Sequence, residues 1–248
     1  MKETVISILH IVQFSGGAAS SYVAKMVADE NPGKTILLFH DTKAEHPDAY
    51  RFRKQVSEYI GLPITEVSDG RSLWEVIYHK KCIPDDGRFP FCTEILKLNQ
   101  AKRFFKTLTE EFTVYNGFGI NEWNRVQKAT VRAEAEGYKA RSLLCEKMIP
   151  DYIVKDTIKN KWRICLPLPY LYLRHNNCIP CFKAGKGHFY KVWKHFPDKY
   201  EKAVQVELAI GYTVFDDISL TQLREKWSKE KFPEEMFQEA NLPCMCAI

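Results

Sequence analysis

A turn of small residues at positions 15–20, Ser-Gly-Gly-Ala-Ala-Ser, is the part of this sequence best suited to bind an anion. Adjacent glycines allow positive φ angles and leave no side chain over the turn. A helix that follows would direct unpaired N–H groups and the positive end of its dipole to the same point. We therefore expect a nucleotide phosphate to bind at Ser15, Gly16, Gly17, Ala18 and Ser20. A plain strand-to-helix turn is the alternative, since the stretch is neither a Walker A loop nor G-x-G-x-x-G.

Cysteines are the second group of residues that could do chemistry. The chain has eight, and Cys178 and Cys181 form a C-x-x-C pair in a turn-like loop. This spacing suits a metal ion or an iron–sulfur cluster, while a redox pair or two half-buried thiols are the alternatives. In an α/β chain, such cysteines indicate metal or redox chemistry better than a disulfide framework.

The elements that must position these residues follow an alternating strand and helix pattern, which predicts an α/β fold. We expect an open parallel five-stranded sheet with helices on both faces, Rossmann-like, plus a C-terminal helical extension. The division predicted is residues 1–175 for the sheet domain and 176–248 for the extension that carries the C-x-x-C. The predicted strands are 5–12, 35–39, 62–67, 113–118 and 163–168, and the helical pieces of the extension are 184–196, 198–211, 219–227 and 233–240.

Asp41 and Thr42 follow the second predicted strand, TILLF. Ligands bind at the carboxyl ends of the strands in open parallel sheets, so we expect these two residues near a bound nucleotide. The helix after them has Pro47 in its first turn and Gly61 past its end.

Composition narrows the classes of protein that fit. A net charge of +5 and a pI near 8.6 suit phosphate-bearing ligands and permit nucleic acid, without the strong basic character of a dedicated DNA-binding module. No apolar run approaches a membrane span, and the start, MKETVISILH, does not have the pattern of a signal peptide. We expect a cytoplasmic protein without a membrane partner.

Several motifs occur in an order that resembles the PP-loop branch of the adenine-nucleotide α-hydrolase (HUP) superfamily, and within it the phosphoadenylyl-sulfate (PAPS) reductase-like proteins. The matching blocks are Ser15 to Ser20 as the S-G-G-x-x-S pyrophosphate loop, His40-Asp41-Thr42 with Glu45, Pro47 and Tyr50, Cys92-Thr93 with Leu96-Lys97, Gly119 to Arg125, Leu166-Pro167-Leu168, and Cys178 to Cys181. The ordered set is far more specific than any one motif.

The resemblance implies an adenine nucleotide, ATP or a related one, with Mg²⁺, and it implies roles for individual residues. Lys97 and Arg125 would be catalytic cations that neutralise a leaving pyrophosphate, and Gly119 would contact the nucleotide. Cys92 would join Cys178 and Cys181 as ligands of a 4Fe–4S cluster. The fourth ligand is open among Cys82, Cys244, Cys246 and His175, or absent.

Departures from the family pattern shape the function that we expect. The loop has Ala19 where many members have aspartate, and the sequence ends LPCMCAI rather than E-C-G-x-H. The leading hypothesis is ATP-dependent adenylation with pyrophosphate release, coupled to cluster-assisted sulfur transfer to a nucleic acid, tRNA or DNA, with a cysteine desulfurase as sulfur donor. The first alternative is a sulfonucleotide reductase that releases sulfite, with Cys246 or Cys244 as nucleophile and thioredoxin as reductant. The second is a non-catalytic nucleotide-binding accessory protein. A homodimer is compatible with each.

Overall fold

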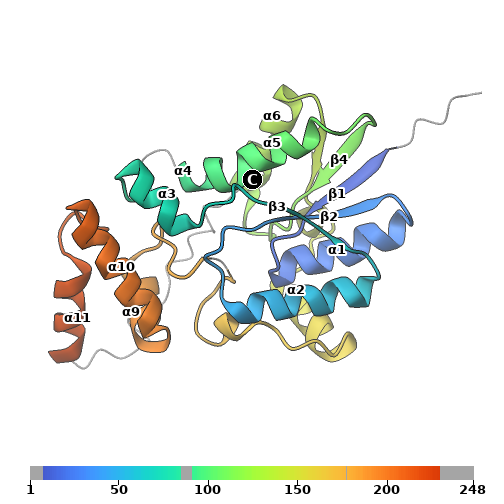
Figure 1. The fold of residues 1–248 in the computed structure, drawn as a ribbon. Helices are drawn as coiled ribbons and strands as arrows, with labels where there is room; N and C mark the ends of the chain where they lie inside the picture. The colour runs from blue at the N-terminus through green and yellow to red at the C-terminus, as the bar shows by residue number, and fades with distance from the viewer. Residues whose placement is uncertain (1–7, 85–90, 177, 230–248) are drawn as a thin grey trace, which may run out of the picture.

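A sheet of five parallel strands organises the chain in the computed structural model, which describes residues 8–84, 91–176 and 178–229 (Figure 1). The strand order is β3-β2-β1-β4-β5, and β1 pairs with β2 on one side and β4 on the other. The predicted α/β fold with a parallel five-stranded sheet is confirmed. The strands are β1 (Leu9–Gln13), β2 (Thr35–His40), β3 (Ile64–Val67), β4 (Phe112–Tyr115) and β5 (Lys139–Arg141).

The fifth strand is not where the sequence predicted it. Residues 163–168 form no strand, and β5 instead pairs Ala140 with Val114 of β4. The apolar character that suggested a strand has another cause, because Ile164 is buried in the cluster beneath α1 and α2. The true edge strand has only three residues and no apolar run, so it gives no periodic signal.

Helices cover both faces of the sheet, as predicted (Figure 1). On one face α1 (Ala18–Glu30) packs against α2 (Pro47–Ile60), and on the other lie α5 (Asn99–Phe105) and α6 (Trp123–Ala135). The chain leaves β1 towards the first face and β4 towards the second. Neighbouring strands whose connections diverge in this way leave a crevice at their carboxyl ends.

Local signals set the ends of α2. Its first residue is Pro47, the His46 ring accepts the Asp48 N–H, and Gly61 ends the helix in the left-handed region with φ of 79°. The predicted ends are therefore confirmed, because proline at the first turn and glycine after the last are local determinants.

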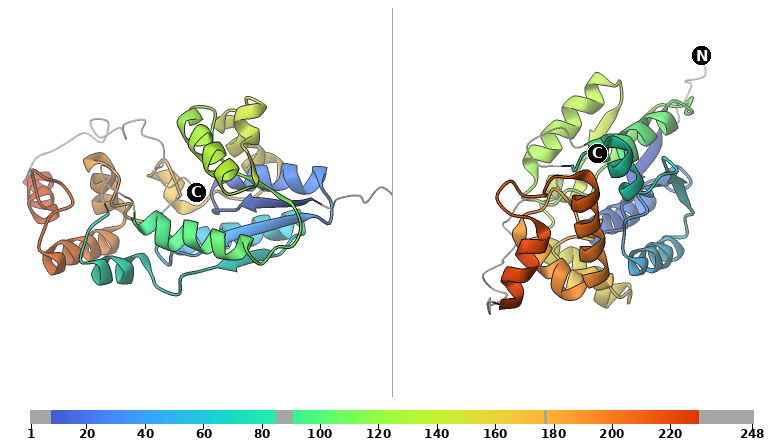
Figure 2. Two further views of the ribbon diagram at one scale, coloured as in Figure 1. Left: turned by 90° about the horizontal axis from the view of Figure 1, so that it is seen from above. Right: turned by 60° about the vertical axis from the view of Figure 1, so that its left-hand side comes forward.

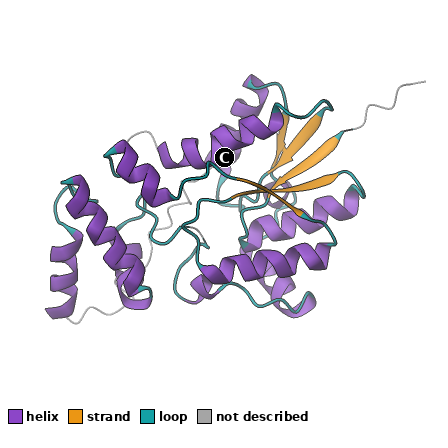
Figure 3. Cartoon of the chain, in the orientation of Figure 1, coloured by secondary structure: helices purple, strands orange, loops and turns teal. Residues whose placement is uncertain are grey.

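Short elements join the sheet to the rest of the chain (Figure 3). They are α3 (Leu73–Lys80), α4 (Phe91–Thr93), the π-helical turns η1 (Glu94–Leu98) and η2 (Thr157–Lys161), α7 (Leu143–Glu146), α8 (Asp151–Asp156) and the 3₁₀ turn η3 (Leu168–Leu171). The sequence pattern predicts no helix or strand between residues 143 and 161. Within the part of the chain described, no helix is long and apolar enough to cross a membrane.

The last three described helices lie at one end of the molecule, beside α3 and away from the sheet (Figure 2). They are α9 (Lys186–His195), α10 (Pro197–Ile210) and α11 (Leu220–Lys229). Their buried residues form one cluster with Trp74 and Ile77 of α3 and with Ile179 and Phe182 of the C-x-x-C segment. The helix predicted at 233–240 lies outside the described residues, and the division between residues 175 and 176 stays a prediction.

Candidate functional site

The glycine turn at residues 15–17 joins β1 to α1 and has a backbone that glycine favours. Gly16 has a φ of 77°, and Gly17 is the extended residue that precedes α1. The hydroxyls of Ser20 and Ser21 donate to the Gly17 carbonyl at 3.1 and 2.9 Å, and the Ser15 and Ser20 hydroxyls lie 3.0 Å apart. These bonds fix the loop at the start of α1.

Two side chains from a distant segment bind the backbone of this loop. The Ala18 N–H donates to the Tyr170 hydroxyl at 3.0 Å, and the Asn176 amide donates to the Gly16 carbonyl at 2.9 Å. The segment that carries them is held in turn by α2. Asp48 accepts the Leu168 N–H at 2.7 Å and pairs with Arg51. The hydrogen bond from Arg51 holds the pKa of the Asp48 carboxyl below its usual range.

A cavity of about 360 Å³ opens at the carboxyl ends of β1 and β4, where the chain turns to opposite faces of the sheet. Its volume is within the range of small-molecule sites. It is lined by Gln13, Ser15, Gly17, Ala19 and Ser20 from β1 and the glycine turn, by Lys97, by 116–122 and Arg125, by 150–152, and by Tyr170, Arg174, His175 and Asn176.

Arg125 is held in place on the wall of this cavity. Its guanidinium pairs with Glu122 and lies 4.3 Å from the ring centre of Phe118. The other Glu122 oxygen accepts the Gly119 N–H at 2.7 Å. The Glu122 carboxylate offsets part of the Arg125 charge, and Lys97 and Arg174 are two further cations that line the same cavity.

Most of the predicted nucleotide-binding and catalytic residues lie at one cavity. Ser15, Gly17, Ser20, Gly119, Lys97 and Arg125 line it, and Gly16 and Ala18 belong to the same loop. Asp41 does not line it: the residue is buried, and its carboxylate accepts from the Tyr50 hydroxyl at 2.7 Å and from the Lys43 N–H at 2.9 Å. Thr42 lines a different pocket. Cys246 lies outside the described residues.

Sequence reasoning missed several lining residues, namely Gln13, Asn116, Tyr170, Arg174 and Asn176. Gln13 ends β1 and Asn116 follows β4, so their position at strand ends was a usable signal. Tyr170 and Asn176 gave none, because they contact the loop across 152 and 160 residues of sequence.

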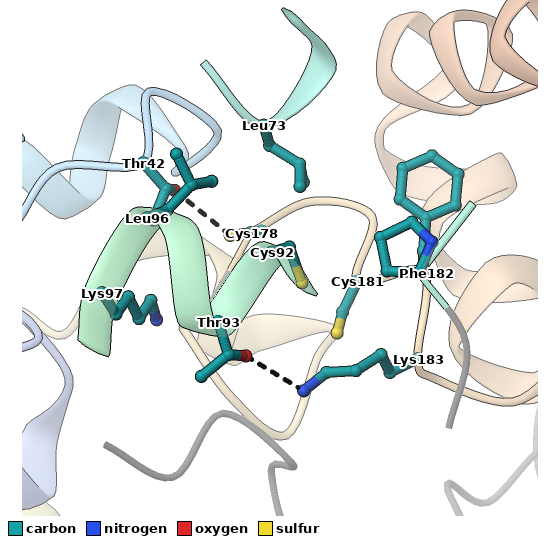
Figure 4. Close-up of a pocket in the computed structure, with 11 residues that line it drawn as sticks. Thr42, Leu73, Cys92, Thr93, Leu96, Lys97, Cys178, Cys181, Phe182 and Lys183 are labelled. Atoms are coloured by element: carbon teal, nitrogen blue, oxygen red, sulfur yellow. Dashed lines mark hydrogen bonds between the residues drawn. The ribbon is translucent and has the colours of Figure 1, made fainter. Parts of the chain in front are cut away.

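Cys92, Cys178 and Cys181 line a second, smaller pocket together with Thr42, Lys97 and Lys183 (Figure 4). The sulfur atoms of Cys92 and Cys181 turn towards the same space, and Cys178 Sγ lies 3.2 Å from the Thr42 hydroxyl. The Lys183 ammonium, whose residue is 7% exposed, donates to the Thr93 hydroxyl at 3.3 Å. Lys97 lines both this pocket and the larger cavity.

Three thiols around one pocket fit an iron–sulfur cluster in ligand type. The space between them, about 20 Å³, is that of a single water. In the part of the chain that the structure describes, no three His, Cys, Asp or Glu side chains are placed to hold a metal ion as they stand. The thiols therefore fit the donor chemistry of a cluster, and the pocket would have to widen to admit one.

The chain belongs to the phosphoadenosine phosphosulfate reductase domain family, whose sequence model matches residues 10–134. This places it among the PAPS reductase-like members of the adenine-nucleotide α-hydrolase superfamily. It is 30% identical over 79 residues to the uncharacterized nin region protein ORF290 of Escherichia phage lambda, and this match covers 27% of the chain and 27% of that protein. A crystal structure of phosphoadenylyl-sulfate reductase from Candida auris, in complex with phosphate, is similar with a TM-score of 0.47 and 16% identity, over 68% of this chain and 78% of that one.

Proposed function

We propose that the chain is an ATP pyrophosphatase that adenylates an acceptor and passes sulfur to it, with a nucleic acid as the acceptor. The observation that carries this proposal is the placement of the glycine loop and three thiols around two pockets that share Lys97. A nucleotide site alone would suit many reactions, whereas a neighbouring thiol site suits the replacement of oxygen by sulfur.

The adenylation step uses groups on both walls of the larger cavity. The acceptor oxygen attacks the α-phosphorus of ATP, the bond from that phosphorus to the bridging oxygen breaks, and pyrophosphate leaves with the bonding electrons. Negative charge grows on the leaving group, so the loop N–H groups, Lys97 and Arg174 stabilise it, and Arg125 adds a charge that Glu122 holds in place. Mg²⁺, when bound, neutralises further phosphate charge through oxygen ligands.

The thiols would act after adenylation has made the acceptor carbon or phosphorus susceptible to attack. Cys92, Cys178 and Cys181, which line the smaller pocket, would hold the cluster, and the fourth ligand stays open. A bound cluster supplies a site for sulfide, and the chain supplies its orientation. Thr42 contacts Cys178, and the backbone N–H of Cys181 donates to the His188 ring at 3.2 Å. A cysteine desulfurase would supply the sulfur as a persulfide, and a thiol reductant would supply the two electrons that convert it to sulfide. The sulfide would attack the activated carbon or phosphorus, and AMP would leave with the acceptor oxygen.

The family match favours a second function, the reduction of a sulfonucleotide with release of sulfite and thioredoxin as reductant. Anaerobic incubation of the full chain with ATP and Mg²⁺, with adenylyl sulfate, and with its 3′-phosphorylated form distinguishes the two. Pyrophosphate from ATP supports the adenylating reaction. Sulfite without pyrophosphate identifies a reductase, and binding of ATP without turnover identifies an accessory protein.

The thiol site is tested by Cys181→Ala, with Cys165→Ala as the control because Cys165 is an exposed free cysteine outside the pocket. Cys181→Ala should abolish sulfur transfer and leave ATP binding unchanged, while the control keeps both. Full sulfur transfer by Cys181→Ala would refute the role of this pocket.

A further inference from the structure

Arg53, on α2, lies directly beneath the glycine loop. It is 3% exposed, and its Cγ and Cδ atoms are 2.5 Å from the point where a Cβ on residue 16 would stand. Its Nε is 3.6 Å from that point. The arginine stem therefore occupies the space that a side chain at position 16 would need, and the guanidinium lies close under the loop.

The Arg53 guanidinium lies between two aromatic rings. Its central carbon is 3.3 Å from the ring centre of Phe39 and 4.0 Å from that of Tyr50. Its Nη1 is buried and has no hydrogen-bond partner in the described ranges. Burial lowers the pKa of Arg53, opposed by the charges of Glu45 and Asp41. Arginine nevertheless remains protonated at any working pH.

The charges of two carboxylates, Glu45 and Asp41, act on this cation. Asp41 accepts from Tyr50 and Lys43, and Glu45 accepts the Thr42 hydroxyl at 2.8 Å. Without Arg53, two negative charges would lie near a loop whose proposed ligand is a polyphosphate. Charges interact strongly where water is excluded, so the balance between the Arg53 charge and the two carboxylates affects the affinity of the loop for an anion.

We infer that Arg53 is a positioning residue whose fixed positive charge beneath Gly16 sets the affinity of the glycine loop for a polyphosphate without touching it. The inference rests on the proposed function, since it assigns the loop a phosphate ligand. A packing role is the competing explanation, in which the stem fills space and the rings hold the guanidinium.

Calorimetric titration of the full chain with inorganic pyrophosphate separates charge from packing. Arg53→Met keeps an unbranched stem and removes the charge, Arg53→Lys keeps a charge, and Arg132→Met is the matched control. Arg132, on α6, also has a buried Nη1 without a partner, but it does not line the cavity. The control therefore changes net charge equally.

We expect Arg53→Met to bind pyrophosphate about tenfold more weakly, with Arg53→Lys and Arg132→Met each within about threefold of the unaltered chain. The loss should shrink in high salt, because it is electrostatic. Affinity in Arg53→Met equal to that of Arg132→Met, or equal losses in Arg53→Lys and Arg53→Met, would overturn the inference while leaving the proposed function intact.

A second variant does not depend on whether Arg53→Met folds. Glu45→Gln removes a negative charge from the same group and should tighten pyrophosphate binding by about threefold. Unchanged or weaker binding overturns the inference. An unaltered chain that binds no pyrophosphate overturns the phosphate site itself, and the proposed function with it.

Discussion

Replacing Gly117 with alanine should push the segment that follows β4 away from the start of α1. A Cβ at this position would lie 2.6 Å from the backbone nitrogen of Ser20 and 2.8 Å from its Cα. Both are backbone atoms in the first turn of α1, so no side-chain rotation relieves the contact. A Cβ does not approach other heavy atoms so closely, so either the segment after β4 or the start of the helix must move by several tenths of an ångström.

The expected cost is about 2 kcal/mol, the typical cost of overpacking a close-packed site. In a chain of this size it would lower the melting temperature by about 4–8 °C. Because the displaced atoms belong to the glycine turn, pyrophosphate affinity should fall as well. Equilibrium urea unfolding measures the first effect and calorimetric titration the second.

Gly185→Ala is the matched control. Gly185 has a φ of −75°, precedes α9, and has nothing within 4 Å of the position of an added Cβ. Its replacement should cost less than about 1 kcal/mol, the difference between glycine and alanine before a helix. If Gly117→Ala proves as stable as Gly185→Ala, the close approach of β4 and α1 is not as the structure has it.

Two further outcomes follow from single side chains. Burial, with Lys97 adding to it, lowers the pKa of His40 from 6.5 to about 3 in the folded chain, so the unfolded chain binds more protons between those values. Stability should then fall as pH drops below 6.5, by up to about 1.4 kcal/mol per pH unit, and urea midpoints should show a shallower slope in His40→Gln. Tyr170→Phe should lose about 1 kcal/mol in thermal unfolding, because the Ala18 N–H loses its partner. Tyr172→Phe, which keeps the stacking of that ring on His195, should not, and equal losses would contradict this role of the Tyr170 hydroxyl.

The parts of the fold that sequence predicts correctly are those with local determinants. Strands β1 and β2 are rich in apolar residues, and Pro47 and Gly61 specify the ends of α2. Strand β5 could not be found this way, since its three residues pair with β4 at an edge and need no apolar run. A strand was wrongly predicted at residues 163–168, because burial under helices, as at Ile164, selects the same residue types as burial in a sheet.

The residues of the candidate site also differ in how well the sequence indicates their position. The glycine loop could be read from adjacent residues, and Lys97 and Arg125 from the order of the family motifs. Asp41 and Thr42 were predicted to lie beside the nucleotide because they follow β2. They do not line the cavity, which opens between β1 and β4, so their contact with a nucleotide stays a prediction. The location of the cavity depends on where the connections diverge, which the position of one strand end does not reveal.

The residues that line the larger cavity come from two parts of the sequence. Its glycine loop and Arg125 fall within residues 10–134, which the family model matches, while Tyr170, Arg174 and Asn176 lie beyond that range. Two proteins that match the family model can therefore share the glycine loop and differ in the residues of the cavity that lie beyond residue 134. Before the substrate of one family member is assigned to another, residues 150–176 of the two proteins should be compared. A fragment that contained only the matched residues would keep the glycine loop and lose the residues that face it.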